Sequence, residues 1–182
     1  MKGVIFTELV RFMEETVSPE FADKVLVNAD LPNNGAFTSV GNYPTAHAAK
    51  MIEAAVELSG IDASELSRQF GRTLFSRFII LFPEILSRYK NASELLDNVG
   101  PHIHTEVCTL YPDAQPPQVS TEKKGDRLIV RYSSHRPMAA IAFGLIEQCL
   151  IHYGDNREVS WERDAPAFSA SFIIAPPSAA AA

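Results

Sequence analysis

The chain has 182 residues, of which 46% are hydrophobic and 21% charged, and its formal net charge is −6 at pH 7, a composition typical of a globular domain with a sizeable core. The negative charge and the scattered Lys and Arg residues argue against a general nucleic-acid-binding protein, because neutralising phosphates requires a basic face. No stretch has the apolar length of a membrane span, and charged residues interrupt the first 18 residues where a signal-peptide core would lie. Two cysteines are too few for a disulfide framework, so we expect a cytoplasmic protein with no membrane partner.

Residues 1–60 are expected to form a helical subdomain. Apolar residues recur at intervals of three and four over residues 2–17, the spacing of an amphipathic helix. Ser18 and Pro19 predict the start of a second helix over 19–28. The Gly, Pro and Asn content of residues 31–44 indicates a loop, and Gly60 is placed to end a third helix over 45–59.

Two further helices are predicted between residues 62 and 111. Asp62 and Glu65 form a D-x-x-E capping signal for a helix over 63–81, whose apolar stripe steps by four residues. Asn91 and Glu94 repeat this signal for a helix that runs to about residue 111. Pro101 lies inside that helix and is expected to kink or divide it, because proline removes one backbone hydrogen bond.

The hydrophobic period changes from 3.6 to 2 after the proline-rich stretch 112–117. Strands are predicted over 118–122 and 127–134 around a turn at 124–126, and over 157–163 and 167–174 around a turn at 164–166, with a helix over 138–153 between the pairs. Residues 175–182 are low in complexity and expected to be a disordered tail. The fold class is therefore α+β, with the helical subdomain packed on an α+β subdomain, residues 61–174, that contains a four-stranded antiparallel sheet.

The stretch "RYSSHR" ends the second predicted strand with an unusual density of hydrogen-bonding groups. Side chains alternate along a strand, so Tyr132, Ser134 and Arg136 share the face of the apolar Leu128 and Val130. A phenol, a hydroxyl and a guanidinium on a buried face need acceptors, and an anion is the obvious one.

The predicted anion site raises the question of what role His104 has. It could be an ordinary core histidine, and a zinc site formed by Cys108, Cys149 and two histidines is not excluded. However, one axial imidazole, an apolar pocket and a clamp for carboxylates are together what a b-type haem requires. The two haem propionates would then be the acceptors that the strand end needs.

These marks together resemble the H-NOX (haem nitric oxide/oxygen binding) family, which includes the haem domain of soluble guanylate cyclase. They are the "MKG" opening, Phe70-Gly71, a histidine thirteen residues before a proline, and Tyr-x-Ser-x-Arg, and the resemblance covers residues 1–174. It implies that haem b lies between the subdomains with His104 as its iron ligand and Tyr132, Ser134 and Arg136 on its propionates. Pro117 and Ile5 are implied to pack against the porphyrin, and Pro117 to bend it.

The resemblance also predicts which gases the haem binds. Family members that hold oxygen place a tyrosine nine residues after the clamp tyrosine, where this chain has Ile141. The other positions implied to lie on the distal side of the haem are apolar as well: Leu9, Leu74, Phe78 and Leu145. Bound oxygen gains from a buried donor whereas NO binds ferrous iron without one, so we expect a ferrous protein that takes NO and CO and excludes O₂.

The expected role is a sensor and not an enzyme. NO binding is expected to break the bond between iron and His104 and to shift the subdomains, and a separate partner protein, a histidine kinase or a cyclic-di-GMP enzyme in the resembling family, would read the change. A haem enzyme is disfavoured because the distal positions offer no acid–base group. The alternative function is a haem-independent module that grips a carboxylate or phosphate.

Overall fold

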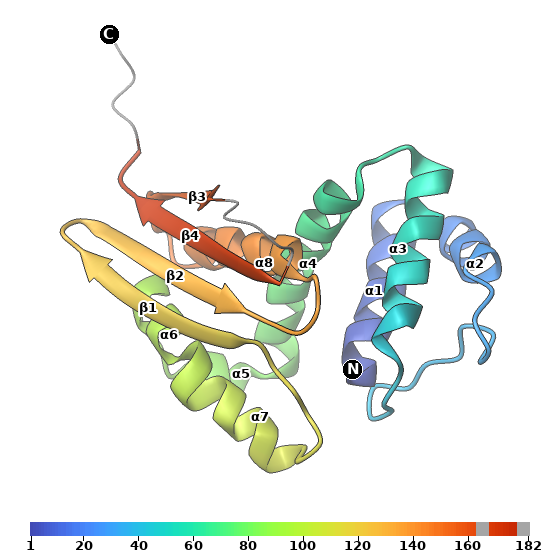
Figure 1. Cartoon of the computed structure of the whole chain (residues 1–182), viewed down its shortest axis with the longest axis horizontal. Coiled ribbons are helices and arrows are strands. Elements are labelled where there is room, and N and C mark those ends of the chain that lie inside the picture. Colours follow the sequence, from blue (N-terminus) through green and yellow to red (C-terminus); the bar gives the residue numbers. More distant parts are fainter. Residues whose placement is uncertain (163–167, 178–182) are drawn as a thin grey trace, which may run out of the picture.

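The computed structural model of the protein describes residues 1–162 and 168–177. Figure 1 shows α1–α3 gathered on one side of the molecule and the β-sheet on the other, with α4 and α8 between them. The elements are α1 (Gly3–Thr16), α2 (Pro19–Asn28), α3 (Thr45–Ser59), α4 (Ala63–Leu81), α5 (Pro83–Leu86), α6 (Ala92–Asn98), the π-helix η1 (Val99–His104), α7 (Thr105–Leu110), β1 (Gln118–Lys124), β2 (Arg127–Ser133), α8 (Ala139–His152), β3 (Glu158–Glu162) and β4 (Ser169–Ala175). The predicted α+β class is confirmed.

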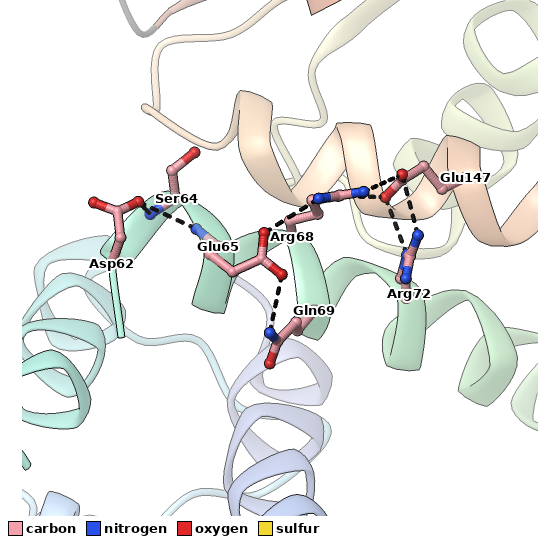
Figure 2. A network of polar contacts seen from close by, with 7 residues as sticks. All are labelled: Asp62, Ser64, Glu65, Arg68, Gln69, Arg72 and Glu147. Atoms are coloured by element: carbon pink, nitrogen blue, oxygen red, sulfur yellow. Dashed lines mark hydrogen bonds and ion pairs between the residues drawn. The ribbon is translucent and has the colours of Figure 1, made fainter. Parts of the chain in front are cut away.

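The predicted helix starts are confirmed by the capping groups. The Ser18 hydroxyl accepts from the backbone N–H of Phe21, Asp62 accepts from those of Ser64 and Glu65, and Asn91 accepts from that of Glu94. The Asp62–Glu65 capping box is only half formed, however. The Glu65 carboxylate binds the side chains of Arg68 and Gln69 instead of returning to the start of the helix (Figure 2).

The helix expected to run from Asn91 to about Tyr111 is divided. Residues 99–104 form a π-helix between α6 and α7. Pro101 has no N–H to continue the α-helical pattern, so the wider π turn accommodates it. Gly100 allows this segment to approach β1, because a Cβ there would lie 2.2 Å from the carbonyl oxygen of Val119. The short helix α5 was not predicted.

The four strands form one antiparallel sheet in the order β1-β2-β4-β3. Alternate residues of β2 and β4 are buried on one face, which α6 and α8 cover: Leu128, Val130, Tyr132, Ala170, Phe172 and Ile174. Arg127, Arg131 and Ser133 are exposed on the other face of β2. This alternation is the one predicted for the strand that carries Tyr132 and leads to Ser134 and Arg136.

The buried hydrophobic residues form two clusters. One joins α1–α3 with Phe70 and Leu74 of α4 and with Ile141 of α8. The other joins the sheet, α6 and α8, and includes Phe75 of α4. Helices α4 and α8 therefore contribute to both cores, and they are the elements through which the two halves of the molecule are packed together.

Two predictions extend beyond the described residues. The turn at 164–166 lies outside them, as do residues 178–182 of the expected tail, while Ala175, assigned to that tail, is the last residue of β4. Within residues 1–162 and 168–177, no helix combines the length and apolar character that crossing a membrane requires.

Candidate functional site

The three residues of the Tyr-x-Ser-x-Arg motif lie at and just beyond the end of β2. Tyr132 is buried, Ser134 and Arg136 are half-buried, and the intervening His135 is exposed. The chain leaves the sheet after Ser133 through two short contacts: Ser134 N–H donates to the Phe168 carbonyl at 2.8 Å, and Arg136 N–H donates to the Ser134 hydroxyl at 3.1 Å. These contacts fix the backbone of Ser134 and Arg136 beside the end of β2.

Arg136 is a partly buried cation without a balancing anion. One terminal nitrogen donates to the carbonyl oxygen of Gln115 at 3.2 Å, but its Nε is buried and unpartnered. In the described part of the chain no carboxylate lies within ion-pair distance of it. Burial lowers the pKa of Arg136, which the nearby Tyr132 only partly offsets. Because burying an unpaired charge is costly, this geometry is suited to an anionic ligand.

Tyr132 is held as a neutral hydrogen-bond donor. Burial raises the pKa of its phenol, against the opposing effects of the Ser134 hydroxyl and the Arg136 charge. The phenol therefore keeps its proton at neutral pH. A neutral O–H and a guanidinium in one place can both donate to the same carboxylate.

His104 is the last residue of η1 and adjoins α7. It is half-buried, and its Nδ1 is buried without a hydrogen-bond partner among the described residues. Burial lowers the pKa of His104, and the nearby backbone of Pro117 offsets part of this effect. The Pro117 backbone does not, however, form a hydrogen bond with Nδ1. The imidazole is thus neutral at pH 7, the form that can ligate a metal. His102, two residues earlier, is exposed and lines a surface pocket of about 320 Å³ instead.

The loop of residues 111–117 brings His104 and the strand end together. Arg136 donates a hydrogen bond to the carbonyl of Gln115, and the Pro117 backbone raises the pKa of His104. Arg136 and His104, 32 positions apart in sequence, are thus each linked to this loop, Arg136 by its hydrogen bond to Gln115 and His104 by the effect of the Pro117 backbone on its pKa. Pro117 itself is half-buried at this junction.

The five residues expected on the distal side and Ile5, expected against the porphyrin, gather in a single apolar region. They come from α1, α4 and α8, and all belong to or pack against the cluster of the N-terminal helices: Ile5, Leu9, Leu74, Phe78, Ile141 and Leu145. Leu9, Leu74 and Ile141 are buried, whereas Ile5, Phe78 and Leu145 keep part of their surface uncovered. Leu9 also lines an apolar cavity of about 50 Å³ between α1, α3 and α4.

Helices α4 and α8, which carry four of these residues, are fixed against each other by glycines. A Cβ on Gly71 would lie 2.2 Å from the carbonyl oxygen of Ile141, and one on Gly144 would lie 2.0 Å from that of Arg68. Neither position has room for a side chain, so the two backbones are in direct contact. This contact determines the spacing between Leu74 and Ile141.

A charged network reinforces the same contact and was not predicted. Figure 2 shows the Glu147 carboxylate of α8 between Arg68 and Arg72 of α4, with Arg68 at 2.6–2.7 Å and Arg72 at 3.0–3.1 Å. Burial alone would raise the pKa of Glu147, but the hydrogen bonds and charges of the two arginines outweigh it and the pKa is lowered. Glu147 is therefore ionised and its pair is intact at neutral pH.

A second unpredicted ion pair joins α1 to α4. Glu8 of α1 is 6% exposed, and its carboxylate accepts from Arg77 Nε of α4 at 2.6 Å. Glu8 adjoins Leu9, and Arg77 adjoins Phe78. The pair ties α1 to α4 beside the apolar region, and no sequence motif indicated that these two residues would meet.

The zinc hypothesis has no support in the described residues. Among them, no group of three or more His, Cys, Asp or Glu side chains is placed to hold a metal ion. Cys149 is buried, and its burial raises the pKa of the thiol to about 12, with a smaller contribution from Asp155. Cys108 is half-buried, with its Sγ 3.8 Å from the carbonyl oxygen of Ala114.

The sequence profile of the Haem-NO-binding family matches residues 2–161. The chain belongs to the H-NOX family. Its members are haem-binding gas-sensor domains and are not catalytic. The expected resemblance is thereby confirmed, and the match covers most of the chain.

Solved H-NOX structures have the same fold. The protein from K. algicida, in the unliganded Fe(II) state, is 28% identical with a TM-score of 0.90, over 99% of this chain and 98% of that one. The H-NOX from Shewanella woodyi, bound to IWP-051 in the Fe(II)CO state, is 30% identical with a TM-score of 0.83, over 100% and 97%. The S. oneidensis protein in the Fe(II)NO state is 19% identical with a TM-score of 0.85, over 96% and 98%, and supports the fold alone. No curated protein matches the chain.

Proposed function

We propose that this H-NOX protein is a nitric oxide sensor that holds haem b, binds NO and CO, discriminates against O₂ and signals to a separate protein. The proposal rests on two side chains, Arg136 and His104, that are both linked to the loop of residues 111–117 and both keep a nitrogen without a hydrogen-bond partner among the described residues. Among residues 1–162 and 168–177, the half-buried Arg136 has no anionic partner, and one nitrogen of the neutral His104 imidazole has no hydrogen-bond partner.

The residues at this junction fit a haem. The Tyr132 phenol, the Ser134 hydroxyl and the Arg136 guanidinium are the donors that would hold its propionates, and His104 would ligate the iron. Pro117 and Ile5 would pack against the porphyrin. When bound, the haem supplies a ferrous centre to which diatomic gases attach.

The apolar region next to this junction supports selectivity for NO. None of its six residues carries a hydrogen-bond donor on its side chain, and Ile141 occupies the position of the family's oxygen-stabilising tyrosine. A protein without such a donor gives oxygen no electrostatic advantage, whereas NO and CO do not require one. Ile5, Phe78 and Leu145 would gain apolar contact when their uncovered surface is occupied.

In this proposal His104 converts gas binding into movement. It joins η1 to α7, so its release from the iron would free α7 and the loop that follows it. A partner responds only if it binds one of the two arrangements better. The family resemblance favours a histidine kinase or a cyclic-di-GMP enzyme as that partner.

The test is the absorption spectrum of the dithionite-reduced protein before NO, after NO and then, in a separate sample, in air. We expect a Soret band typical of haem with one histidine ligand, a shift with NO that reports loss of that ligand, and no stable spectrum of an oxygen complex. A stable oxygen complex would mean that a distal donor exists and would overturn the selectivity. Absence of a Soret band after reconstitution with haem would favour the haem-independent anion-binding module.

A further inference from the structure

The amino terminus is joined to residues 41–43 as a small antiparallel bridge. The Met1 ammonium donates to the Tyr43 carbonyl at 2.7 Å, Tyr43 N–H donates to the Met1 carbonyl at 3.0 Å, and Gly3 N–H donates to the Gly41 carbonyl at 2.7 Å. Gly3 must be glycine, because a Cβ there would lie 1.9 Å from the Thr38 carbonyl oxygen. Residues 1–3 and 41–43 therefore behave as one unit at the start of α1.

This bridge presents two side chains in the same direction. Lys2 and Asn42 are directly paired, and paired residues of an antiparallel bridge place their side chains on one face. Both reach Asp113. Lys2 Nζ lies 2.7 Å from Asp113 Oδ1, and the Asn42 amide donates to the other carboxylate oxygen. The Lys2 side chain is only 17% exposed, although that of Asp113 is 57% exposed.

The contact also includes the end of α7. Lys2 Nζ lies 4.6 Å from the centre of the Tyr111 ring, a cation–π geometry. Tyr111 N–H donates to the Val107 carbonyl at 2.8 Å, and Ala114 N–H donates to the Tyr111 carbonyl at 2.8 Å, so Tyr111 and Asp113 are held to α7 by its own backbone. A shift of α7 must therefore strain or break the contact with Lys2 and Asn42.

The surrounding charges favour an intact contact. The pKa of Asp113 is lowered chiefly by its hydrogen bond from Lys2, so its carboxylate is ionised at neutral pH. Burial lowers the pKa of the Met1 ammonium, and the charges of Arg136 and Lys2 lower it further, while Asp113 acts in the opposite direction. Asp113 thus offsets part of the positive charge at this edge of the molecule.

We propose that Lys2, Asn42 and Asp113 form a latch that holds the end of the His104-bearing segment against the amino terminus and sets how readily that segment shifts. The inference rests on the proposed function, because it concerns the movement that follows release of His104. A contact present in one arrangement and absent in the other biases the equilibrium by its own free energy. Because the Asp113 carboxylate is 57% exposed and solvent screens the pair, we expect an effect of about two- to fivefold.

The experiment compares amide hydrogen exchange of residues 105–115 in the haem-loaded, reduced protein before and after NO. The variants are Asp113→Asn, Lys2→Met and their combination. Lys124→Met is the matched control, because it removes an exposed lysine from its 3.2 Å pair with Glu122 on β1. We expect Asp113→Asn and Lys2→Met to raise exchange before NO by about two- to fivefold and to reduce the further increase caused by NO.

Each outcome is decisive. The double variant should raise exchange by less than the product of the two single effects, because both single variants remove the Lys2–Asp113 pair and differ only in the Tyr111 and Asn42 contacts. The latch is overturned if exchange before NO equals that of the unmodified protein, if Lys124→Met has the same effect, or if exchange rises but the increment caused by NO is unchanged. Failure of the proposed function looks different: NO would then alter exchange in none of the proteins, including the unmodified one.

Discussion

The Arg136 guanidinium donates to the carbonyl oxygen of Gln115 at 3.2 Å and leaves its Nε without a partner among the described residues. The guanidinium thus holds the loop that follows α7 and keeps a donor free for a ligand. Pro117 lies two residues after Gln115, and its backbone raises the pKa of His104. The same loop therefore connects the propionate-binding and iron-binding ends of the proposed haem site.

Replacing Arg136 should weaken haem retention. Hydrogen bonds to charged groups contribute about 1.5–3 kcal/mol, so Arg136→Met is expected to accelerate haem transfer to a scavenging protein by about 10- to 100-fold. Arg131→Met is the control, because Arg131 lies on the exposed face of the same strand and pairs with Glu122 at 2.8 Å. Equal rates for the two variants would contradict the assignment of Arg136 to the propionates.

Introducing a distal donor should change the gas selectivity. Ile141→Tyr places a phenol at the position where oxygen-binding relatives are expected to carry one, so the reduced protein should give a stable oxygen complex in air. Ile141→Phe adds similar bulk without the hydroxyl and should not. The absorption spectra of both variants in air check this, and identical spectra would show that the hydroxyl does not reach the ligand.

Removing the Glu147 charge should destabilise the contact between α4 and α8. The carboxylate side chain is 11% exposed, whereas those of Arg68 and Arg72 are 35% and 43% exposed, so solvent screens part of the pair. We expect Glu147→Gln to lower the free energy of unfolding by about 2 kcal/mol at pH 7. Glu122→Gln is the control: it removes a solvent-screened carboxylate from β1 and should lower the free energy of unfolding by much less than Glu147→Gln.

The Glu147 effect should also depend on pH in a defined direction. The folded-state pKa of Glu147 is lowered, so its contribution is complete above the unfolded-state pKa of about 4.3 and is lost as the pH falls through the folded value. Denaturant titrations should therefore show the gap between the two proteins closing below about pH 5. A gap that persists unchanged at pH 3 would rule out the charge as its cause.

Gly144→Ala should destabilise the protein, although replacing glycine by alanine inside a helix usually has the opposite effect. Alanine normally stabilises a helix interior by about 1 kcal/mol relative to glycine. Here the added Cβ would meet the Arg68 carbonyl at 2.0 Å, so we expect a loss of about 1–3 kcal/mol as the helices are forced apart. Thermal unfolding measures the sign directly, and a stabilised variant would show that α4 and α8 are not in backbone contact.

Much of the fold follows from local patterns in the sequence. The helices at 19–28, 45–59 and 63–81 have the predicted bounds, because their caps and apolar periods act within a few residues of each other. Alternation along β2 likewise predicted which side chains point inward. The interruption at Pro101 was predicted, but its form as a π-helix depends on packing against β1 through Gly100.

The candidate site could be predicted only as a set of residues. The His104–Pro117 spacing and the Tyr132–Ser134–Arg136 motif singled them out, yet the hydrogen bond from Arg136 to Gln115 is tertiary. The pairs Arg68–Glu147, Arg77–Glu8 and Lys2–Asp113 join residues 79, 69 and 111 positions apart. Composition and periodicity determined the helices, the strands and the inward faces, because these arise from neighbouring residues. Only the tertiary structure decided which charges meet and which glycines are compressed, because those contacts depend on where distant segments are brought together.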